Sequence, residues 1–262
     1  ISPEQVVLAK GSNLLQGKTL EGPFKDIGSI PVPAWKSLCA KHRIARRLFR
    51  LMYFNTIALG NHRYFTIFDK TIGIFDNREF IPVSINNRFR VLRQGVAQAS
   101  NSLFFGEYFG NPERDCVRIF RIDLRSATPR LKTAYVFPRR TIRHVHRIHR
   151  DPYTNDLWCM TGDLPNECQI LKTSDEFNSL DVVGSGDETW RCISHVFLKD
   201  YIYYATDSEF QQNAIYRITR KTWRRDFICQ IDGPVYYSTH LGADIFFAVT
   251  AEMCPSQFSH HA

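Results

Sequence analysis

An apolar run that ends in an acidic residue recurs five times and constrains this sequence more than any other feature. The five acids are Asp69, Glu107, Asp163, Asp207 and Glu252, and the intervals between them are 38, 56, 44 and 45 residues. Short runs rich in Val, Ile, Phe and Tyr between turn-forming clusters are typical of β-strands. A strand repeat of about 45 residues is typical of a β-propeller, in which each repeat forms one four-stranded blade.

Further strand-like runs surround these acids at regular positions. After three of the acids a second strand is expected, at 117–122, 169–173 and 214–219. Before four of the acids we expect a strand that carries Arg, His or Tyr, at 88–93, 143–148, 190–196 and 235–240. One such sheet cannot bury both faces, whereas a ring of stacked blades can. We therefore predict an all-β fold: a β-propeller of four-stranded blades with five recognisable units, the last cut short, and the blade number left open.

The first 52 residues have a different character. Residues 1–33 are rich in Gly, Pro and Lys and predict an irregular lead-in with one short strand, which could also complete the fifth blade. Residues 34–52 carry apolar side chains at helical spacing and many Lys and Arg, which predicts an N-terminal basic helix after Pro33. We divide the chain into this lead-in and helix (1–52) and a propeller body (53–262), a single domain overall.

Charge and cysteine content narrow the partners. The net charge of +8 is compatible with an anionic ligand. The basic helix could have a solvated charged face, or it could dock to anionic lipid or polysaccharide. Nucleic acid is disfavoured as a partner. No apolar run reaches the length of a membrane span. The seven cysteines are an odd number without zinc-type spacing, which indicates buried free thiols. With no signal-peptide pattern in view, a cytoplasmic location is favoured.

One stretch resembles a known family. The segment from Asp151-Pro-Tyr through Trp158 and Asp163 to Ile170-Leu-Lys-Thr173-Ser-Asp175 is similar to the BNR or Asp-box repeats of sialidase-like propellers. The blade-level resemblance covers residues 85–250. Thr173 and Asp175 fit the Asp-box, while Phe177 stands where Gly is expected and Leu180 where Trp is expected. The family includes glycan hydrolases, lyases and binders, so the resemblance implies a carbohydrate-directed propeller without naming a reaction.

Innermost strands line the channel of a propeller, and we place the strands that lead each blade there. Cleavage of a glycosidic bond needs two carboxyl groups, and arginines bind an anionic sugar through paired hydrogen bonds. The candidate carboxyl pair is Glu107 and Asp163, with Asp207 in reserve. The alternative reading of these charges is structural ion pairing between blades. The predicted site residues are Glu107, Asp163, His146 and Asp207 as catalytic groups and Arg90, Arg143, His144, Arg191 and Tyr236 as substrate-binding groups.

The two histidines His144 and His146 lie two apart, so on a strand they face the same side. They could supply a base, as a polysaccharide lyase requires, half of a metal site, or hydrogen bonds to backbone and to acids such as Asp163. No third ligand has regular spacing, so we predict neither a metal nor a cofactor. Glu107 and Tyr108 are neighbours that face opposite ways, which counts against a simple sialidase pair.

The predicted function is the binding or cleavage of an anionic oligo- or polysaccharide in the central funnel, by a hydrolase, a lyase or a pure binder. The alternative is a non-enzymatic scaffold for a protein partner. A glycan site predicts that Arg90, Glu107, His146, Asp163 and Arg191 share one open pocket. A scaffold predicts that these groups are paired and closed off, with an exposed apolar patch elsewhere.

Overall fold

The chain forms antiparallel β-sheets that belong to two compact units. The computed structural model describes residues 6–49, 51, 54–60, 63–68, 71–76, 78–84, 91, 95–252, 254 and 255. Unit 1 contains residues 1–87 and 123–131, and unit 2 contains residues 88–122 and 132–262. The predicted division between residues 52 and 53 stays a prediction. None of the described helices is long and apolar enough to cross a membrane.

Unit 1 contains two sheets and two short helices. The first sheet has the order β1-β2-β3 and the second β4-β5-β6-β7. Its elements are β1 (Val6–Lys10), β2 (Asn13–Gly17), β3 (Lys25–Ser29), α1 (Ala34–Ala40), α2 (Arg43–Leu48), β4 (Phe54–Gly60), β5 (Arg63–Phe68), β6 (Thr71–Asp76) and β7 (Glu79–Val83).

The lead-in is more ordered than its composition predicts, because residues 6–29 form three paired strands and not one. Leu14 on β2 packs with Ile30 and with the aromatic rings of Tyr64, Phe68 and Phe75. Gly28 adopts a φ of 135°, and a Cβ there would lie 2.7 Å from the ring of Phe75. Glycine thus permits the close approach of this backbone to the Phe75 ring. The same glycine interrupts the apolar pattern, so the sequence shows little strand periodicity there.

The predicted helix over 34–52 is two helices. His42 adopts an extended backbone with φ −89° and ψ 118°, which ends the first helix and begins the second. Neither α1 nor α2 buries a side chain. The apolar positions that suggested one amphipathic helix are therefore on the surface, and Arg50 and Met52 lie outside the described residues.

The described part of unit 2 contains three four-stranded sheets and a two-stranded sheet, each with its strands in chain order. The strands are β8 (Val96–Ala99), β9 (Ser102–Gly106), β10 (Val117–Asp123), β11 (Leu131–Phe137), β12 (His144–Arg150), β13 (Leu157–Gly162), β14 (Gln169–Thr173), β15 (Asp181–Ser185), β16 (Cys192–Phe197), β17 (Tyr201–Thr206), β18 (Ala214–Thr219), β19 (Arg225–Gln230), β20 (Val235–Leu241) and β21 (Asp244–Val249). Two single-turn 3-10 helices, η2 (Pro165–Glu167) and η3 (Glu188–Trp190), precede β14 and β16.

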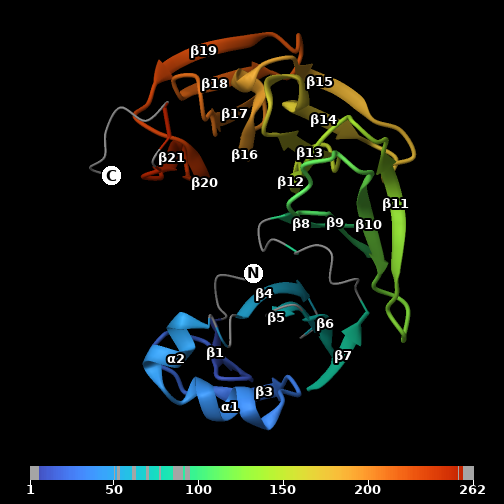
Figure 1. The fold of residues 1–262 in the computed structure, drawn as a ribbon, viewed down its shortest axis with the longest axis vertical. Helices are drawn as coiled ribbons and strands as arrows, with labels where there is room; N and C mark the ends of the chain where they lie inside the picture. The colour runs from blue at the N-terminus through green and yellow to red at the C-terminus, as the bar shows by residue number, and fades with distance from the viewer. Residues whose placement is uncertain are drawn as a thin grey trace. The chain divides into compact units, whose positions relative to one another are not determined.

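The sheets of unit 2 are arranged like consecutive propeller blades. The first strands contact each other in succession, β8 with β12, β12 with β16 and β16 with β20. In Figure 1 these first strands lie on the inner side of the unit and β11, β15 and β19 on the outer side. The predicted strands 143–148, 190–196 and 235–240 correspond to β12, β16 and β20. The predicted strand 88–93 lies outside the described residues except for Val91, and β8 is the first described strand of its sheet.

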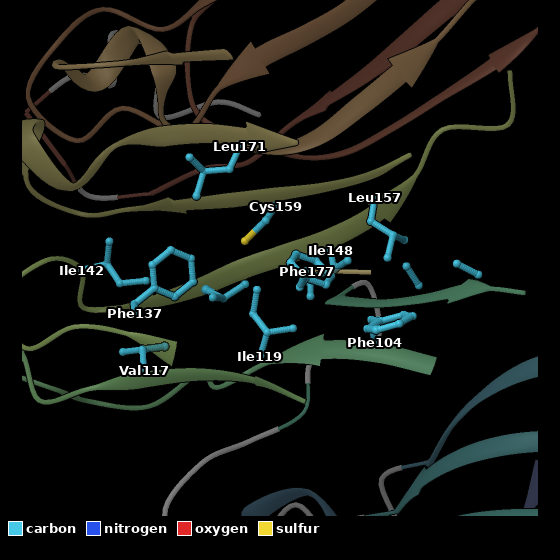
Figure 2. Packing of buried hydrophobic residues seen from close by; sticks show 13 residues of the cluster. Phe104, Val117, Ile119, Phe137, Ile142, Ile148, Leu157, Cys159, Leu171 and Phe177 are labelled. Carbon is cyan, nitrogen blue, oxygen red and sulfur yellow. The ribbon is translucent and has the colours of Figure 1, made fainter. Parts of the chain in front are cut away.

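The core of unit 2 forms where neighbouring sheets stack. Cys159 on β13 packs with Phe104, Ile119 and Ile148 toward the preceding sheet (Figure 2). Its neighbours Trp158 and Met160 pack in a second cluster with residues of β16 and β17. Successive strand residues point to opposite faces, so β13 is covered on both sides and all its residues are buried. This stacking explains why its sequence is a continuous apolar run.

The hairpin turn after β14 contains the residues that resemble an Asp-box. Asp175 accepts hydrogen bonds from the hydroxyl of Thr173, at 2.7 Å, and from the backbone N–H of Ser179, at 2.9 Å. Phe177 has a left-handed φ of 74°, yet its ring is buried in the core 5.6 Å from that of Phe104. A phenylalanine at the expected glycine position therefore exchanges backbone freedom for packing.

The seven cysteines are all free thiols. Three of them, Cys159, Cys168 and Cys192, are buried, Cys229 is exposed, and the others are half-buried. The expectation that most would be buried is therefore too broad. The buried three belong to the sheet interior, where burial raises the pKa of the Cys159 and Cys192 thiols.

Candidate functional site

The predicted acids occupy equivalent positions in successive sheets of unit 2. Glu107, Asp163 and Asp207 directly follow β9, β13 and β17, the second strand of each sheet, and Glu252 follows β21. Asp69 lies outside the described residues. Arg143 and Arg191 stand just before the first strands β12 and β16. The acids and the arginines therefore meet at the same end of adjoining sheets.

Asp163 is the centre of a charged cluster. Its Oδ2 accepts a hydrogen bond from Nη1 of Arg143 at 2.9 Å. Its Oδ1 lies 3.5 Å from Nη2 of Arg191, 3.4 Å from Nε2 of His146 and 3.6 Å from Nε2 of His144. The backbone of Asp163 has a φ of 127°, a conformation that side-chain-bearing residues rarely adopt and that costs free energy. Strain of this kind is frequent at functional sites.

Arg191 connects Asp163 to the next sheet. Its Nε lies 3.3 Å from Oδ2 of Asp207, and its Nη1 lies 3.7 Å from carboxylate oxygens of both Glu188 and Glu209. The backbone carbonyl of Arg191 also accepts a hydrogen bond from the N–H of Asp207 at 2.9 Å. This guanidinium is thus held between two carboxylates that follow second strands.

The histidines are held by the preceding sheet. Nδ1 of His144 lies 3.2 Å from the carbonyl oxygen of Phe109. The ring of Tyr108 lies 4.1 Å from that of His144 and 6.2 Å from that of His146, measured between centroids. Burial and the nearby His146 lower the pKa of His144 to about 4, so its imidazole is neutral at pH 7.

We call the following residues the Asp163 cluster: Tyr108, Arg143, His144, His146, Asp163, Arg191 and Asp207. They come from three adjoining sheets. Sequence reasoning predicted all of them except Tyr108, which it considered only as an unsuitable partner for Glu107. Tyr108 directly follows Glu107, and neighbouring strand residues face opposite sides. This alternation, which argued against Glu107 and Tyr108 as a sialidase pair, directs the Tyr108 ring toward the histidines.

Two of the carboxyl groups that contact Arg191, those of Asp163 and Asp207, have pKa values shifted in opposite directions. Burial raises the pKa of Asp207 to about 6, aided by the charges of Glu252 and Asp163 and opposed by that of Arg191. Burial alone would also raise the pKa of Asp163, but the adjacent His146, His144 and Arg191 hold it well below its usual range. Near pH 6 one group is therefore half protonated while the other stays ionised.

Two other predicted residues pair at the end of the chain. The hydroxyl of Tyr236, on β20, donates a short hydrogen bond to the Glu252 carboxylate. Burial and this carboxylate raise the pKa of Tyr236. The charge of Asp207 contributes to the same shift, which places this pair in the electrostatic environment of the cluster.

Glu107 has a different environment from the one predicted. It is buried, its carboxylate accepts the backbone N–H of Arg118 at 2.8 Å, and its Oε2 lies 3.6 Å from the guanidinium of Arg118. These contacts are with β10 of its own sheet. Arg90 lies outside the described residues, so its predicted role stays a prediction.

Sequence reasoning missed Glu188. This fully buried carboxylate accepts backbone N–H groups of Phe210 and Gln211 at 2.9 and 3.0 Å, in the loop after β17. Glu188 also reaches Arg191. It lies on the single-turn helix η3, a local feature without a recognisable sequence signal, and it orders the loop that follows Asp207.

Known proteins resemble this chain in fold only. No protein-family profile and no curated protein matches the sequence. A prolyl endopeptidase structure is similar, with a TM-score of 0.51, 10% identity and coverage of 86% of this chain and 33% of that chain. An exo-β-1,3-galactanase from Phanerochaete chrysosporium in complex with β-1,3-galactotriose has a TM-score of 0.48 and 11% identity, and the match covers 74% of this chain and 55% of that chain. A nidogen–laminin complex has a TM-score of 0.45 and 12% identity, and the match covers 69% of this chain and 62% of that chain. The chain spans less than two thirds of each.

Proposed function

We propose that unit 2 binds an anionic sugar residue at the Asp163 cluster. Arg143 and Arg191 come from adjoining sheets and meet at one carboxylate, so a second carboxylate can be bound between them. The side chain of Arg143 is 40% exposed, and its Nε has no hydrogen-bond partner within the described residues. Guanidinium groups offer five donors in a planar array that suits a sugar carboxylate.

Cleavage of a glycosidic bond is the chemistry that the pKa values support. A glycosidase needs one carboxyl group that donates a proton and a second that stays ionised. Asp207, with its pKa raised to about 6, is the proposed acid, and ionised Asp163 the proposed base or nucleophile. The proposal rests on one observation above all: a single guanidinium, that of Arg191, contacts two carboxyl groups whose pKa values diverge.

The Asp163–Asp207 pair replaces the Glu107–Asp163 pair as the favoured one. Glu107 is held by a backbone N–H of β10, whereas Asp207 is held by the same arginine as Asp163. The proposal keeps the resemblance to sialidase-like Asp-box repeats, which the turn around Asp175 supports through its hydrogen bonds. It favours a hydrolase over a lyase, because Asp207 can act as the proton donor at the leaving oxygen.

The test of cleavage uses fluorogenic aryl glycosides of uronic acids and of sialic acid, with aryl glucoside as the uncharged comparison. Wild type is expected to release the fluorophore from a charged substrate, with a rate that falls as pH rises above about 6. Asp207→Asn should lose at least about a hundredfold in rate. The matched control Asp200→Asn, at an exposed turn, should retain wild-type rate. Equal rates for both variants would refute the role of Asp207.

A second candidate function is a protein-interaction scaffold, because unit 1 exposes an apolar surface. Trp35, Leu38, Ile44, Leu48 and Phe49 on and beside α1 and α2 are each more than half exposed. Lys and Arg residues of the same helices alternate with them. A partner with apolar and acidic side chains would complement this surface. A partner that co-purifies with wild type and is lost in Ile44→Glu/Leu48→Glu would support this function.

A further inference from the structure

Three potential metal ligands converge inside the Asp163 cluster. One ring nitrogen each of His144 and His146 and a carboxylate oxygen of Asp163 all lie within 4.8 Å of one another. The strand pairing of β12 with β13 is irregular between Val145 and Arg147, which places a bulge at His146. Bulges commonly redirect a side chain next to a functional site. The third ligand, which sequence spacing could not supply, comes from the end of the neighbouring strand β13.

The hydrogen-bond arrangement fixes the proton of His144. A carbonyl oxygen only accepts, so Nδ1 of His144, 3.2 Å from the carbonyl of Phe109, carries the hydrogen. In the tautomer with its hydrogen on Nδ1, the Nε2 of His144 presents a lone pair toward Oδ1 of Asp163. Two acceptors that face each other are unfavourable unless a cation lies between them. Metal-bound histidines typically donate their other N–H to a backbone carbonyl in this way.

Neither Nε2 atom makes a well-aligned hydrogen bond within the described residues. Both histidine side chains are about nineteen-twentieths buried, and both Nε2 atoms lack a hydrogen bond among the described residues. They lie 3.6 and 3.4 Å from Oδ1 of Asp163, without hydrogen-bond alignment. Ligands about 2.0–2.1 Å from one tetrahedral ion are roughly 3.3–3.5 Å apart. The two nitrogen–oxygen separations are therefore close to those of ligands that share one ion, and the two ring nitrogens lie within 4.8 Å of each other.

The surrounding charges allow a cation. Arg143 occupies Oδ2 of Asp163, which leaves Oδ1 toward the histidines. Arg191 lies on the Oδ1 side, but its charge is shared with Asp207, Glu188 and Glu209. The positive charge of Arg191 is thus shared among four carboxylates, those of Asp163, Glu188, Asp207 and Glu209.

From this geometry we infer that His144, His146 and Asp163 bind one divalent transition-metal ion, with zinc as its most fitting member. Two imidazoles and one carboxylate suit Zn²⁺ and its first-row neighbours, whereas Ca²⁺ and Mg²⁺ prefer sites built from oxygen ligands. Three protein ligands leave a fourth position open for water or a ligand oxygen. This inference goes beyond the binding of a sugar and does not depend on it. An Asp163 carboxylate that binds the ion through Oδ1 and Arg143 through Oδ2 would hold the ion and would not also act as the nucleophile of the proposed cleavage.

The test is a titration of the chelator-stripped full chain with Co²⁺, followed by displacement with Zn²⁺. His260 and His261 could take up metal themselves, so the titrations use a His260→Ala/His261→Ala background without an affinity tag. Binding of one Co²⁺ per chain should produce visible absorption bands that Zn²⁺ abolishes. His144→Gln and His146→Gln should each bind at least about tenfold more weakly. The matched control His240→Ala, at an exposed position on β20, should bind like the background.

A second measurement locates the ion without any substitution at the site. The imidazole ¹⁵N shifts of Nε2 in His144 and His146 should move on addition of Zn²⁺, while those of His240 stay in place. Absence of Co²⁺ uptake, or unchanged affinity in a folded His144→Gln or His146→Gln variant, overturns the inference. No sugar is present in these titrations, so their failure leaves the sugar proposal standing. A failed sugar titration in chelator equally leaves the metal site standing.

Discussion

Nε of Arg191 lies 3.3 Å from Oδ2 of Asp207, and this contact joins the start of β16 to the end of β17. The same guanidinium reaches Asp163 in the preceding sheet. One buried cation thus connects two sheets of unit 2 at the end where the candidate site lies. Its removal takes away the guanidinium partner of the buried Asp207 and one of the two guanidinium partners of Asp163, which keeps Arg143.

Arg191→Met is therefore expected to lower the free energy of unfolding by about 3–5 kcal/mol at pH 7, because it breaks buried ion pairs from one side. Arg191→Met/Asp207→Asn should lose less, since the second substitution removes one of the uncompensated charges. Urea unfolding followed by far-ultraviolet circular dichroism measures both. A double variant that is as unstable as the sum of its single variants would show that Arg191 and Asp207 are not coupled.

Asp151 and Arg220 form a second buried pair between sheets of unit 2. Asp151, in the turn between β12 and β13, is fully buried and lies 3.0 Å from Nη2 of Arg220, which follows β18. Asp151→Ala should cost about 3–5 kcal/mol, because the guanidinium then remains without its carboxylate. A double-mutant cycle with Arg220→Met measures the coupling, and additive losses would contradict a direct interaction.

His195 makes the fold sensitive to acid. It is buried against the rings of Trp158, Phe197 and Tyr204, and burial lowers its pKa from the usual 6.5 of histidine to about 3. Between these two values the unfolded chain binds a proton that the folded chain does not. Stability is therefore lost as pH falls from about 6.5 toward 3, by up to about 1.4 kcal/mol per pH unit.

His195→Phe should flatten this dependence of the unfolding free energy on pH, measured by urea titration at intervals between pH 4 and 7. Some slope will remain, because burial also lowers the pKa of His149. His240→Ala, at an exposed position, is the control and should keep the wild-type slope. A His195→Phe slope equal to that of wild type would mean that His195 is protonated in the folded state.

Substitutions at Phe177, in the β14–β15 turn, test whether packing of its ring offsets the strain of its left-handed backbone. Phe177→Ala should cost about 3–5 kcal/mol, because the ring fills the core between two sheets. Glycine usually costs about 0.5–1 kcal/mol more than alanine in regular structure. At the left-handed φ of 74° this order should reverse, so Phe177→Gly should be at least as stable as Phe177→Ala. Thermal unfolding compares the two, and a less stable glycine variant would contradict a strained backbone.

The strands were predictable where alternation and length carry the signal. The runs at 169–173 and 214–219 coincide with β14 and β18, and the acids after β9, β13 and β17 stand where the repeat placed them. The lead-in was predicted to contain one strand and contains three, because all three strands are short and polar residues and glycine interrupt the apolar pattern of β2 and β3. The break at His42 was missed because apolar spacing continues across it.

The candidate site was predictable as a set of residues and not as a set of contacts. Placing Arg143, His144, His146, Asp163, Arg191 and Asp207 together followed from counting strands, since equivalent positions in stacked sheets converge. The contact of Glu107 with the backbone of Arg118 and the buried Glu188 depend on hairpin and loop geometry, which repeats do not specify. The opposite pKa shifts of Asp163 and Asp207 depend on burial and on which cations face each one.

Isothermal calorimetry with glucuronate and with N-acetylneuraminate tests whether the Asp163 cluster binds an anionic sugar, as proposed. Wild type is predicted to bind one of the two acids in chelator-containing buffer and to show no binding of glucose. The affinity of Arg143→Met for the bound acid should be at least about tenfold lower. Arg139→Met removes an equally charged but more exposed side chain that pairs with Asp115, and should bind normally. No binding of either acid by folded wild type, or equal losses in both variants, would contradict the claim.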